Sequence, residues 1–340
     1  MKPPAAAYGR LRAVVRRQPL LPVLVVLLIV LAGRYDGFAT TANFRNIAVQ
    51  ASPLIIAAVG ATYVIITSGI DLSVGSVLFL AAAIESSHAL IGEPAGIVFV
   101  AIGAAGLTMG LLNGAAVALT RVPALIVTLA TMQVYRGLGG HITRQQDINL
   151  PAHLRGIGTG TLLGVPAPVL LAALAALGGG LVFSRTTFGR YVQAVGSNRG
   201  AALNAGIPVR TVTAGVYVLA GLLAAVASLA QTARLGAVQP SIGQGYELTV
   251  ITAVVLGGTS LFGGRGSITG TVLGALVLTT AQTGLVFSGA SPYVFDIVRG
   301  GVLLVAVIAA AARWRNLAQT MRPTGRSSTP SDEGRTVSTA

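Results

Sequence analysis

A short polar break at residues 69–76, Gly-Ile-Asp-Leu-Ser-Val-Gly-Ser, separates two long apolar runs. Such a break is costly in lipid unless it lines a cavity or lies at a membrane boundary, and an acid there is a functional candidate by default. Two interpretations are open. Asp71 caps the following helix in a tight turn, or the segment lines a cavity and acts as a gate. The candidate residues are Gly69, Asp71, Ser73, Gly75 and Ser76.

No catalytic set of residues accompanies this break. The histidines at 88, 141 and 153 lack metal-ligand spacing, and the chain has no cysteine. Its one lysine is Lys2, which excludes a Walker A loop, because that loop needs a lysine after its glycines. We therefore expect no catalytic residue, no metal and no cofactor, and any ATP hydrolysis should take place in a partner subunit.

Several polar side chains fall within or near the apolar runs and could bind or pass a polyol of sugar size. Each could equally be satisfied by hydrogen bonds between helices, and for any single residue that simpler interpretation is favoured. The candidates for lining a path are Gln50, Asn113, Thr131, Gln133, Gln231 and Gln282.

The composition is that of a membrane protein. Of 340 residues, 53% are hydrophobic and 9% are charged, whereas a soluble domain has about 25% charged residues. The net charge of +14 comes from basic residues at the ends of apolar runs, as in cytoplasmic loops, and not from a nucleic-acid site. We expect a multi-pass protein of the cytoplasmic membrane that contacts lipid and binds no nucleic acid.

The predicted fold is an all-α polytopic transmembrane bundle of about ten spans, within a range of roughly eight to ten. The expected domains are a basic tail over 1–19, a transmembrane domain over 20–312 whose first run is a signal anchor, and a disordered tail over 313–340. The apolar runs are 20–34, 47–67, 77–91, 95–119, 123–140, 164–183, 212–233, 247–262, 268–288 and 293–312.

The distribution of arginines predicts the topology. The N-terminal tail, the loop over 184–211 and the start of the C-terminal tail are basic and fall on one side, so both termini are predicted to be cytoplasmic. This topology places the 69–76 break at the cytoplasmic edge. It places Arg136 and Glu247 near the outer boundary, where snorkelling would explain both.

The loop over 184–211 is the longest predicted cytoplasmic loop. An apolar patch at 191–195 and a helix-favouring stretch at 201–205, which ends at Gly206, predict two short amphipathic helices. On a basic loop such helices favour docking of a protein partner at the membrane face. The alternative is that they lie on anionic lipid.

Glycines spaced four apart predict close helix packing, in one set at 106, 110 and 114 and in another at 266, 270 and 274. The glycine-rich stretch at 257–267 lacks the lysine and the strand–helix context of a nucleotide site. It loosely repeats the break-then-helix pattern of 69–84. A parallel duplication is therefore one interpretation, although unrelated segments are the favoured one.

Three ordered segments resemble the permease subunits of bacterial ribose-type simple-sugar ABC importers. The first is 69–76. The second is 187–198, Thr-Phe-Gly-Arg-Tyr-Val-Gln-Ala-Val-Gly-Ser-Asn, and the third is the glycine-rich segment 245–267. The resemblance covers about residues 43–312. It implies a permease homodimer or heterodimer, a separate ATP-binding subunit, an extracytoplasmic solute-binding protein, and a pentose, hexose or related polyol as substrate.

The resemblance also implies that the family's ATPase-contacting loop corresponds to 184–207. The implied coupling residues are Arg185, Thr186, Gly189, Arg190, Gly196, Asn198, Ala201, Ala202 and Gly206. Family members often have acidic residues directly after the Asn, whereas this chain has Arg199 and Gly200, which argues against a salt bridge from that position. A bulky charged residue at 196 or 202 is expected to abolish transport and ATPase association.

We expect alternating access in which closure of the ATPases pushes on this loop. The alternative is a secondary transporter of a small polar solute driven by an ion gradient. Such proteins carry acids at broken helices near the membrane midplane, and Asp71 would then have that role.

Overall fold

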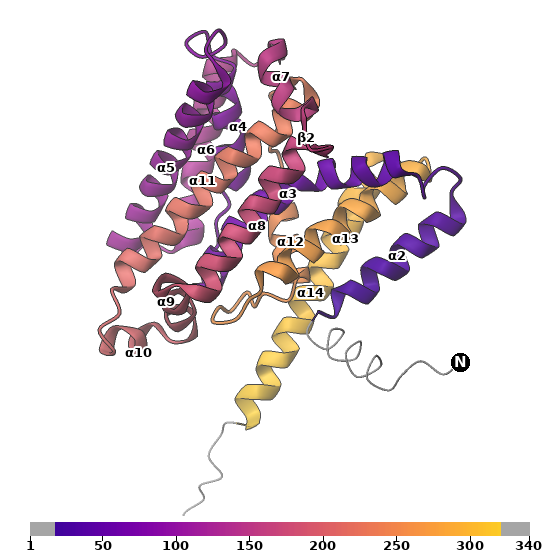
Figure 1. Ribbon diagram of the computed structural model, residues 1–340. Helices are drawn as coiled ribbons and strands as arrows, with labels where there is room; N and C mark the ends of the chain where they lie inside the picture. The colour runs from indigo at the N-terminus through magenta and orange to yellow at the C-terminus, as the bar shows by residue number, and fades with distance from the viewer. Residues whose placement is uncertain (1–17, 321–340) are drawn as a thin grey trace, which may run out of the picture.

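The computed structural model describes residues 18–320 as a bundle of helices (Figure 1), which confirms the predicted helical class. Each predicted apolar run coincides with a helix. These helices are α2 Leu20–Arg34, α3 Thr41–Ile66, α4 Val74–Glu85, α5 Ala95–Leu119, α6 Ala124–Thr143, α8 Ala167–Arg185, α11 Val209–Leu235, α12 Tyr246–Leu256, α13 Ile268–Phe287 and α14 Pro292–Thr320. The last helix continues beyond the predicted boundary at 312. The rest of the predicted tails, 1–17 and 321–340, lies outside the described residues.

Short elements connect the long helices. They are α7 Ala152–Thr159, α9 Thr187–Ser197 and α10 Arg199–Asn204, with β1 Ile148–Asn149 paired to β4 Ala237–Val238 and β2 Thr161–Leu162 paired to β3 Val165–Pro166. In Figure 1, α7 and β2 lie at one end of the bundle, and α9 and α10 lie at the other. This separation agrees with the loops that the arginines place on opposite sides.

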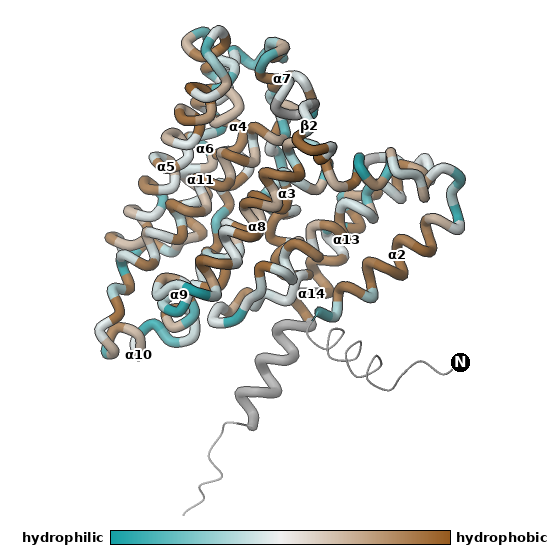
Figure 2. The backbone as a smooth tube through the Cα atoms, viewed as in Figure 1, coloured by the Kyte–Doolittle hydropathy of each residue, from teal (hydrophilic) through white to brown (hydrophobic). Residues whose placement is uncertain are grey.

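Among the described residues, five helices are long and apolar enough to cross a membrane: α3, α5, α8, α11 and α13. Apolar residues run along the helices and hydrophilic ones gather in the connections at both ends (Figure 2). The chain is thus a multi-pass membrane protein. Length and composition do not test the predicted count of about ten spans or the cytoplasmic placement of the termini, so both stay predictions.

Helix α3 forms the centre of the bundle, because every residue from Ala51 to Ile66 is buried. It packs against α8, α11, α12 and α13. The predicted close packing at spaced glycines is confirmed between α5 and α11, where a Cβ on Gly114 would lie 2.6 Å from the carbonyl oxygen of Ala214. It is also confirmed between α12 and α13, where a Cβ on Gly274 would overlap the carbonyl oxygen of Ala253.

Helices α4 and α12 are short and run in opposite directions. The last residue of α4, Glu85, meets Thr232 near the end of α11. Helix α12 instead ends beside the loop in which Gly264 donates a hydrogen bond to Ile66, the last residue of α3. Helices α4 and α12 are therefore antiparallel. The parallel duplication considered for 69–84 and 259–277 concerns α4 and α13 instead, and it stays one interpretation of the two glycine-containing breaks.

Candidate functional site

Asp71 closes a turn immediately before α4. Its side chain is 7% exposed, and its Oδ1 accepts hydrogen bonds from the backbone N–H of Ser73 at 2.8 Å and from the Ser73 hydroxyl at 2.6 Å. Ser73 is the N-cap residue of α4, and its side chain makes no capping hydrogen bond to that helix. The predicted capping role of Asp71 is therefore wrong, because its carboxylate lies two residues too early and binds the cap residue itself.

A buried hydrogen-bond network continues from this turn into two neighbouring helices. The amide of Asn113 on α5 donates to the Ser73 hydroxyl at 2.7 Å, and the hydroxyl of Tyr135 on α6 donates to Asn113 Oδ1 at 3.3 Å. The four side chains of this network are all buried: Asp71, Ser73, Asn113 and Tyr135. Because each bond satisfies a group that water cannot reach, the network fixes the break between α5 and α6.

Thr128 on α6 holds the backbone on both sides of Asp71. Its hydroxyl accepts a hydrogen bond from the N–H of Leu72 at 3.2 Å and is within 3.2 Å of the Ile70 carbonyl oxygen, to which it can donate. The break is thus an ordered segment that is hydrogen-bonded to α5 and α6. Its residue Ser76 donates to the Ser73 carbonyl oxygen inside the first turn of α4.

The first turn of α4 meets the segment that leads into α12. A Cβ on Gly75 would overlap the carbonyl oxygen of Gly243, and a Cβ on Gly243 would overlap that of Gly75. Gly243 also has φ +75°, a conformation that favours glycine. We call this contact between the starts of α4 and α12 the half-helix junction.

Two charged side chains surround the half-helix junction. Arg136 on α6 donates to the carbonyl oxygen of Ile242 at 2.7 Å and lies over the Phe79 ring, 4.6 Å from its centroid. Glu247 lies in the first turn of α12, with Oε2 2.8 Å from the position of a Cβ on Gly75. A carboxylate near helix N-termini is favourable, because the N–H groups there carry partial positive charge.

Charges within apolar runs are costly and need partners. Arg136 finds its partners in the segment before α12 and in Phe79 of α4, which the sequence does not show to be close. The position of Arg136 and Glu247 near the outer boundary, where both would snorkel, stays a prediction.

Of the predicted path-lining residues, only Asn113 joins the network. Thr131 donates within its own helix, to the Thr128 carbonyl oxygen at 3.3 Å. The four glutamines make no side-chain hydrogen bond within the described part of the chain; they are Gln50, Gln133, Gln231 and Gln282. Sequence reasoning missed Tyr135 and Thr128, which look like ordinary helix residues until α6 is placed beside the break.

The predicted pair of short helices in the loop over 184–211 is confirmed as α9 and α10. The Thr186 side chain caps α9 by accepting the Gly189 N–H at 3.2 Å, and the Asn198 side chain caps α10 by accepting the Ala201 N–H at 3.0 Å. Gly206, with φ +77°, follows the end of α10 in a left-handed conformation. The local sequence thus determines both helices.

Part of the predicted coupling set faces the core. A Cβ on Gly196 would overlap the carbonyl oxygen of Ile66, one on Gly189 would overlap that of Phe183, and Ala202 is 4% exposed. A bulky charged residue at 196 or 202 would therefore disrupt packing and would not test docking. The predicted coupling residues that are exposed are Arg185, Arg190, Asn198, Ala201 and Gly206, and Thr186 is half-buried.

Comparison with known proteins gives one family. Residues 43–307 match the family model described as branched-chain amino acid transport system / permease component. The chain is 42% identical over 302 residues to the ribose import permease protein RbsC of Escherichia coli K12, covering 87% of this chain and 94% of the relative. No solved structure matches the chain with significance.

Two further relatives from Escherichia coli K12 are each 36% identical to the chain. The galactofuranose transporter permease protein YtfT matches over 275 residues, 80% of this chain and 81% of the relative. The L-arabinose transport system permease protein AraH matches over 290 residues, 85% and 88%. The matched region contains the 69–76 break, the half-helix junction and both short helices of the 184–211 loop, so the chain belongs to the family of branched-chain amino acid transport system permease components.

Proposed function

We propose that the chain is the membrane permease subunit of an ABC importer that carries a simple sugar, a pentose, hexose or related polyol. The observation that supports this is the 42% identity to a ribose import permease over 94% of that relative. Relatives named for galactofuranose and L-arabinose point to the same substrate class. The family description mentions branched-chain amino acids, but the similar relatives are named for sugars.

The importer that we propose contains two permease copies, a separate ATP-binding subunit and an extracytoplasmic solute-binding protein. The ATP-binding subunit docks on the exposed side of α9 and α10. Tyr191 and Leu203 are exposed there, with 37% and 65% of their surface accessible. Both termini, α9 and α10 are cytoplasmic in this arrangement, and the permease has about ten spans.

Contacts between distant segments connect the docking helix α9 to the 69–76 break, so that movement of one can move the other. Gly196 of α9 packs on the Ile66 end of α3, and the Ser68 hydroxyl donates to the Phe262 carbonyl oxygen at 3.0 Å. The chain passes from Ser68 through Asp71 to the half-helix junction. Movement of α9 by the ATP-binding subunit therefore moves the end of α3, and separation of α4 from α12 opens the path.

Uptake into proteoliposomes tests this function. The permease, reconstituted with its ATP-binding subunit and solute-binding protein, should take up labelled ribose, arabinose or galactose only with internal ATP. Labelled leucine serves as the control for the other substrate class. Uptake by the permease alone that collapses with a proton or sodium gradient would overturn the proposal in favour of a secondary transporter.

A further inference from the structure

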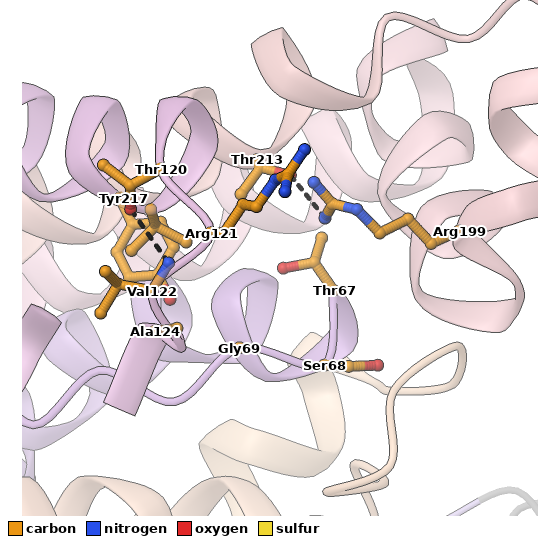
Figure 3. A pocket seen from close by; sticks show the side chains of 11 residues that line it. Thr67, Ser68, Gly69, Thr120, Arg121, Val122, Ala124, Arg199, Thr213 and Tyr217 are labelled. Atoms are coloured by element: carbon orange, nitrogen blue, oxygen red, sulfur yellow. Dashed lines mark hydrogen bonds between the residues drawn. The ribbon is translucent and has the colours of Figure 1, made fainter. Parts of the chain in front are cut away.

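A cavity of about 250 Å³ lies at the end of the bundle that carries α10. Its walls come from the turn after α3, the turn between α5 and α6, α10 and the first part of α11 (Figure 3). Gly69, the first residue of the polar break, is part of this wall. The cavity is smaller than the roughly 300–1,000 Å³ of sites for drug-sized ligands, so it suits a small ligand.

Two arginines from different elements face this cavity. The guanidinium groups of Arg121, in the α5–α6 turn, and Arg199, in α10, point toward each other (Figure 3). Within the described residues the only ion pair joins Asp296 and Arg299, so no carboxylate neutralises either arginine. Two like charges that face one space repel each other unless an anion lies between them.

The wall also offers a buried hydroxyl without a partner. Tyr217 on α11 is 1% exposed, and its hydroxyl makes no hydrogen bond among the described residues. The hydroxyl lies beside Gly69, 2.7 Å from the position that a Cβ there would take. Because an unpaired buried hydroxyl is costly, it points to a ligand oxygen as its partner.

Arg199 is already held in place by its neighbour. Its Nη1 donates to the Thr213 hydroxyl oxygen at 3.3 Å, and that hydroxyl in turn donates to the Val209 carbonyl oxygen within α11. The remaining N–H groups of the guanidinium stay available. Planar guanidinium groups match the oxygens of a phosphate, to which they can donate two parallel hydrogen bonds.

We propose that this cavity binds a phosphate-bearing anion between Arg121 and Arg199, with the Tyr217 hydroxyl donating to one of its oxygens. The phosphate comes either from a small soluble phosphomonoester or from the headgroup of an anionic lipid. Bound there, it joins α10 to the α5–α6 turn. If α10 docks the ATP-binding subunit as proposed above, the ligand restrains the loop over 184–207 that couples docking to transport. The binding itself does not depend on that function.

The test uses the purified full-length permease in nanodiscs of neutral phosphatidylcholine, without any partner protein. Calorimetric titration with inorganic phosphate and with glycerol 3-phosphate should show binding, and uncharged glycerol should show none. Arg121→Gln or Arg199→Gln should weaken binding about tenfold, because each removes hydrogen bonds to a charged group. Tyr217→Phe should weaken it less. Arg45→Gln, an exposed change near the start of α3, whose opposite end leads into the cavity wall, is the matched control.

Nanodiscs that contain phosphatidylglycerol distinguish the two sources. Hydrogen exchange of residues 199–206 that slows with anionic lipid alone, and only while both arginines are present, identifies a headgroup. Slowing with soluble phosphate in neutral nanodiscs identifies a free anion. The proposal is overturned if neither source binds, or if binding is the same in both arginine variants. It is also overturned if these arginines matter only in the complex with the ATP-binding subunit, since the anion is then a carboxylate of that protein.

Discussion

Four buried side chains, Asp71, Ser73, Asn113 and Tyr135, form one connected network across three segments of the chain. Removal of one member takes a buried hydrogen-bond partner from its neighbours, although Tyr135 also donates to the Met109 carbonyl oxygen at 3.1 Å. The acid therefore has a structural role in this state, in which it orders the start of α4. Any transport role of Asp71 must act through the turn that it closes.

Asn113→Ala should be destabilising, because it removes one of the two buried partners of each of the Ser73 and Tyr135 hydroxyls. We expect a loss of about 1–3 kcal/mol in the free energy of unfolding, measured by thermal or denaturant unfolding of the purified permease. Gln133→Ala, an exposed polar position on α6, should change stability little. Equal stability of the two variants would show that the network contributes nothing.

At the scale of elements, the half-helix junction is where α4 and α12 begin. Both helices start deep in the bundle and run toward opposite ends, with Glu247 beside their N-termini and Arg136 holding the segment before α12. Only glycine on both sides permits the backbones to touch. A small separation of these helices would therefore break several contacts together.

Gly75→Ala should force the two helices apart or cost about 1–3 kcal/mol of stability through overpacking. In the uptake assay we expect either loss of transport or transport no longer tightly coupled to ATP hydrolysis. Gly103→Ala is the control, because the nearest atom to its new Cβ is a Leu222 side-chain carbon at 3.8 Å. Normal coupled uptake by Gly75→Ala would rule out the junction as a gate.

Variants in α10 can distinguish a role in docking from a role in packing. Leu203→Glu changes a side chain that is 65% exposed, so the fold should survive while association with the ATP-binding subunit weakens by about tenfold or more. Pull-down and stimulated ATPase activity measure this. Leu163→Glu, the same change at an exposed position at the opposite end, is the control. Ala202→Glu should instead destabilise the loop, because Ala202 is buried.

If Leu203→Glu and Leu163→Glu associate equally well with the ATP-binding subunit, α10 is not its docking site. If Ala202→Glu is as stable as the unmodified permease, the packing role of that residue is wrong. The three variants together therefore distinguish a docking surface from a buried support.

For the molecule as a whole, the sequence predicted where helices occur but not how long each one is. The runs over 77–91 and 247–262 were expected as spans, whereas α4 has 12 residues and α12 has 11. Hydropathy shows which residues are apolar, but where a helix ends inside the bundle also depends on the neighbours against which it packs. The partners of Arg136 could not be predicted for the same reason.

In the loop over 184–207, too, the sequence predicts the helices but not their packing. Caps and the glycine at 206 predict α9 and α10 from local chemistry alone. Which side of α9 is buried depends on the end of α3, so the core-facing position of Gly196 could not be predicted. The polar break is recognisable from its unusual composition, but Asn113, to which it is hydrogen-bonded, and Tyr135, which bonds to Asn113, lie far along the chain.

The absence of cysteine makes the topology directly testable. Single-cysteine variants Ser197→Cys in α9 and Leu163→Cys at the opposite end can be labelled with a membrane-impermeant maleimide in intact spheroplasts. We expect labelling of residue 163 without permeabilisation and of residue 197 only after it. The reverse pattern would invert the predicted orientation, and equal labelling would place both positions on one side.

Ser68, Gly196 and Gly264 meet at one point, although long stretches of chain separate them. The ribosome synthesises these segments in order, so the contacts of α9 are incomplete until Gly264 has been synthesised and inserted. The surface for the ATP-binding subunit would therefore not be fully formed on a nascent permease. Assembly of the importer would then follow the end of membrane insertion, and no ATP would be hydrolysed at an incomplete permease.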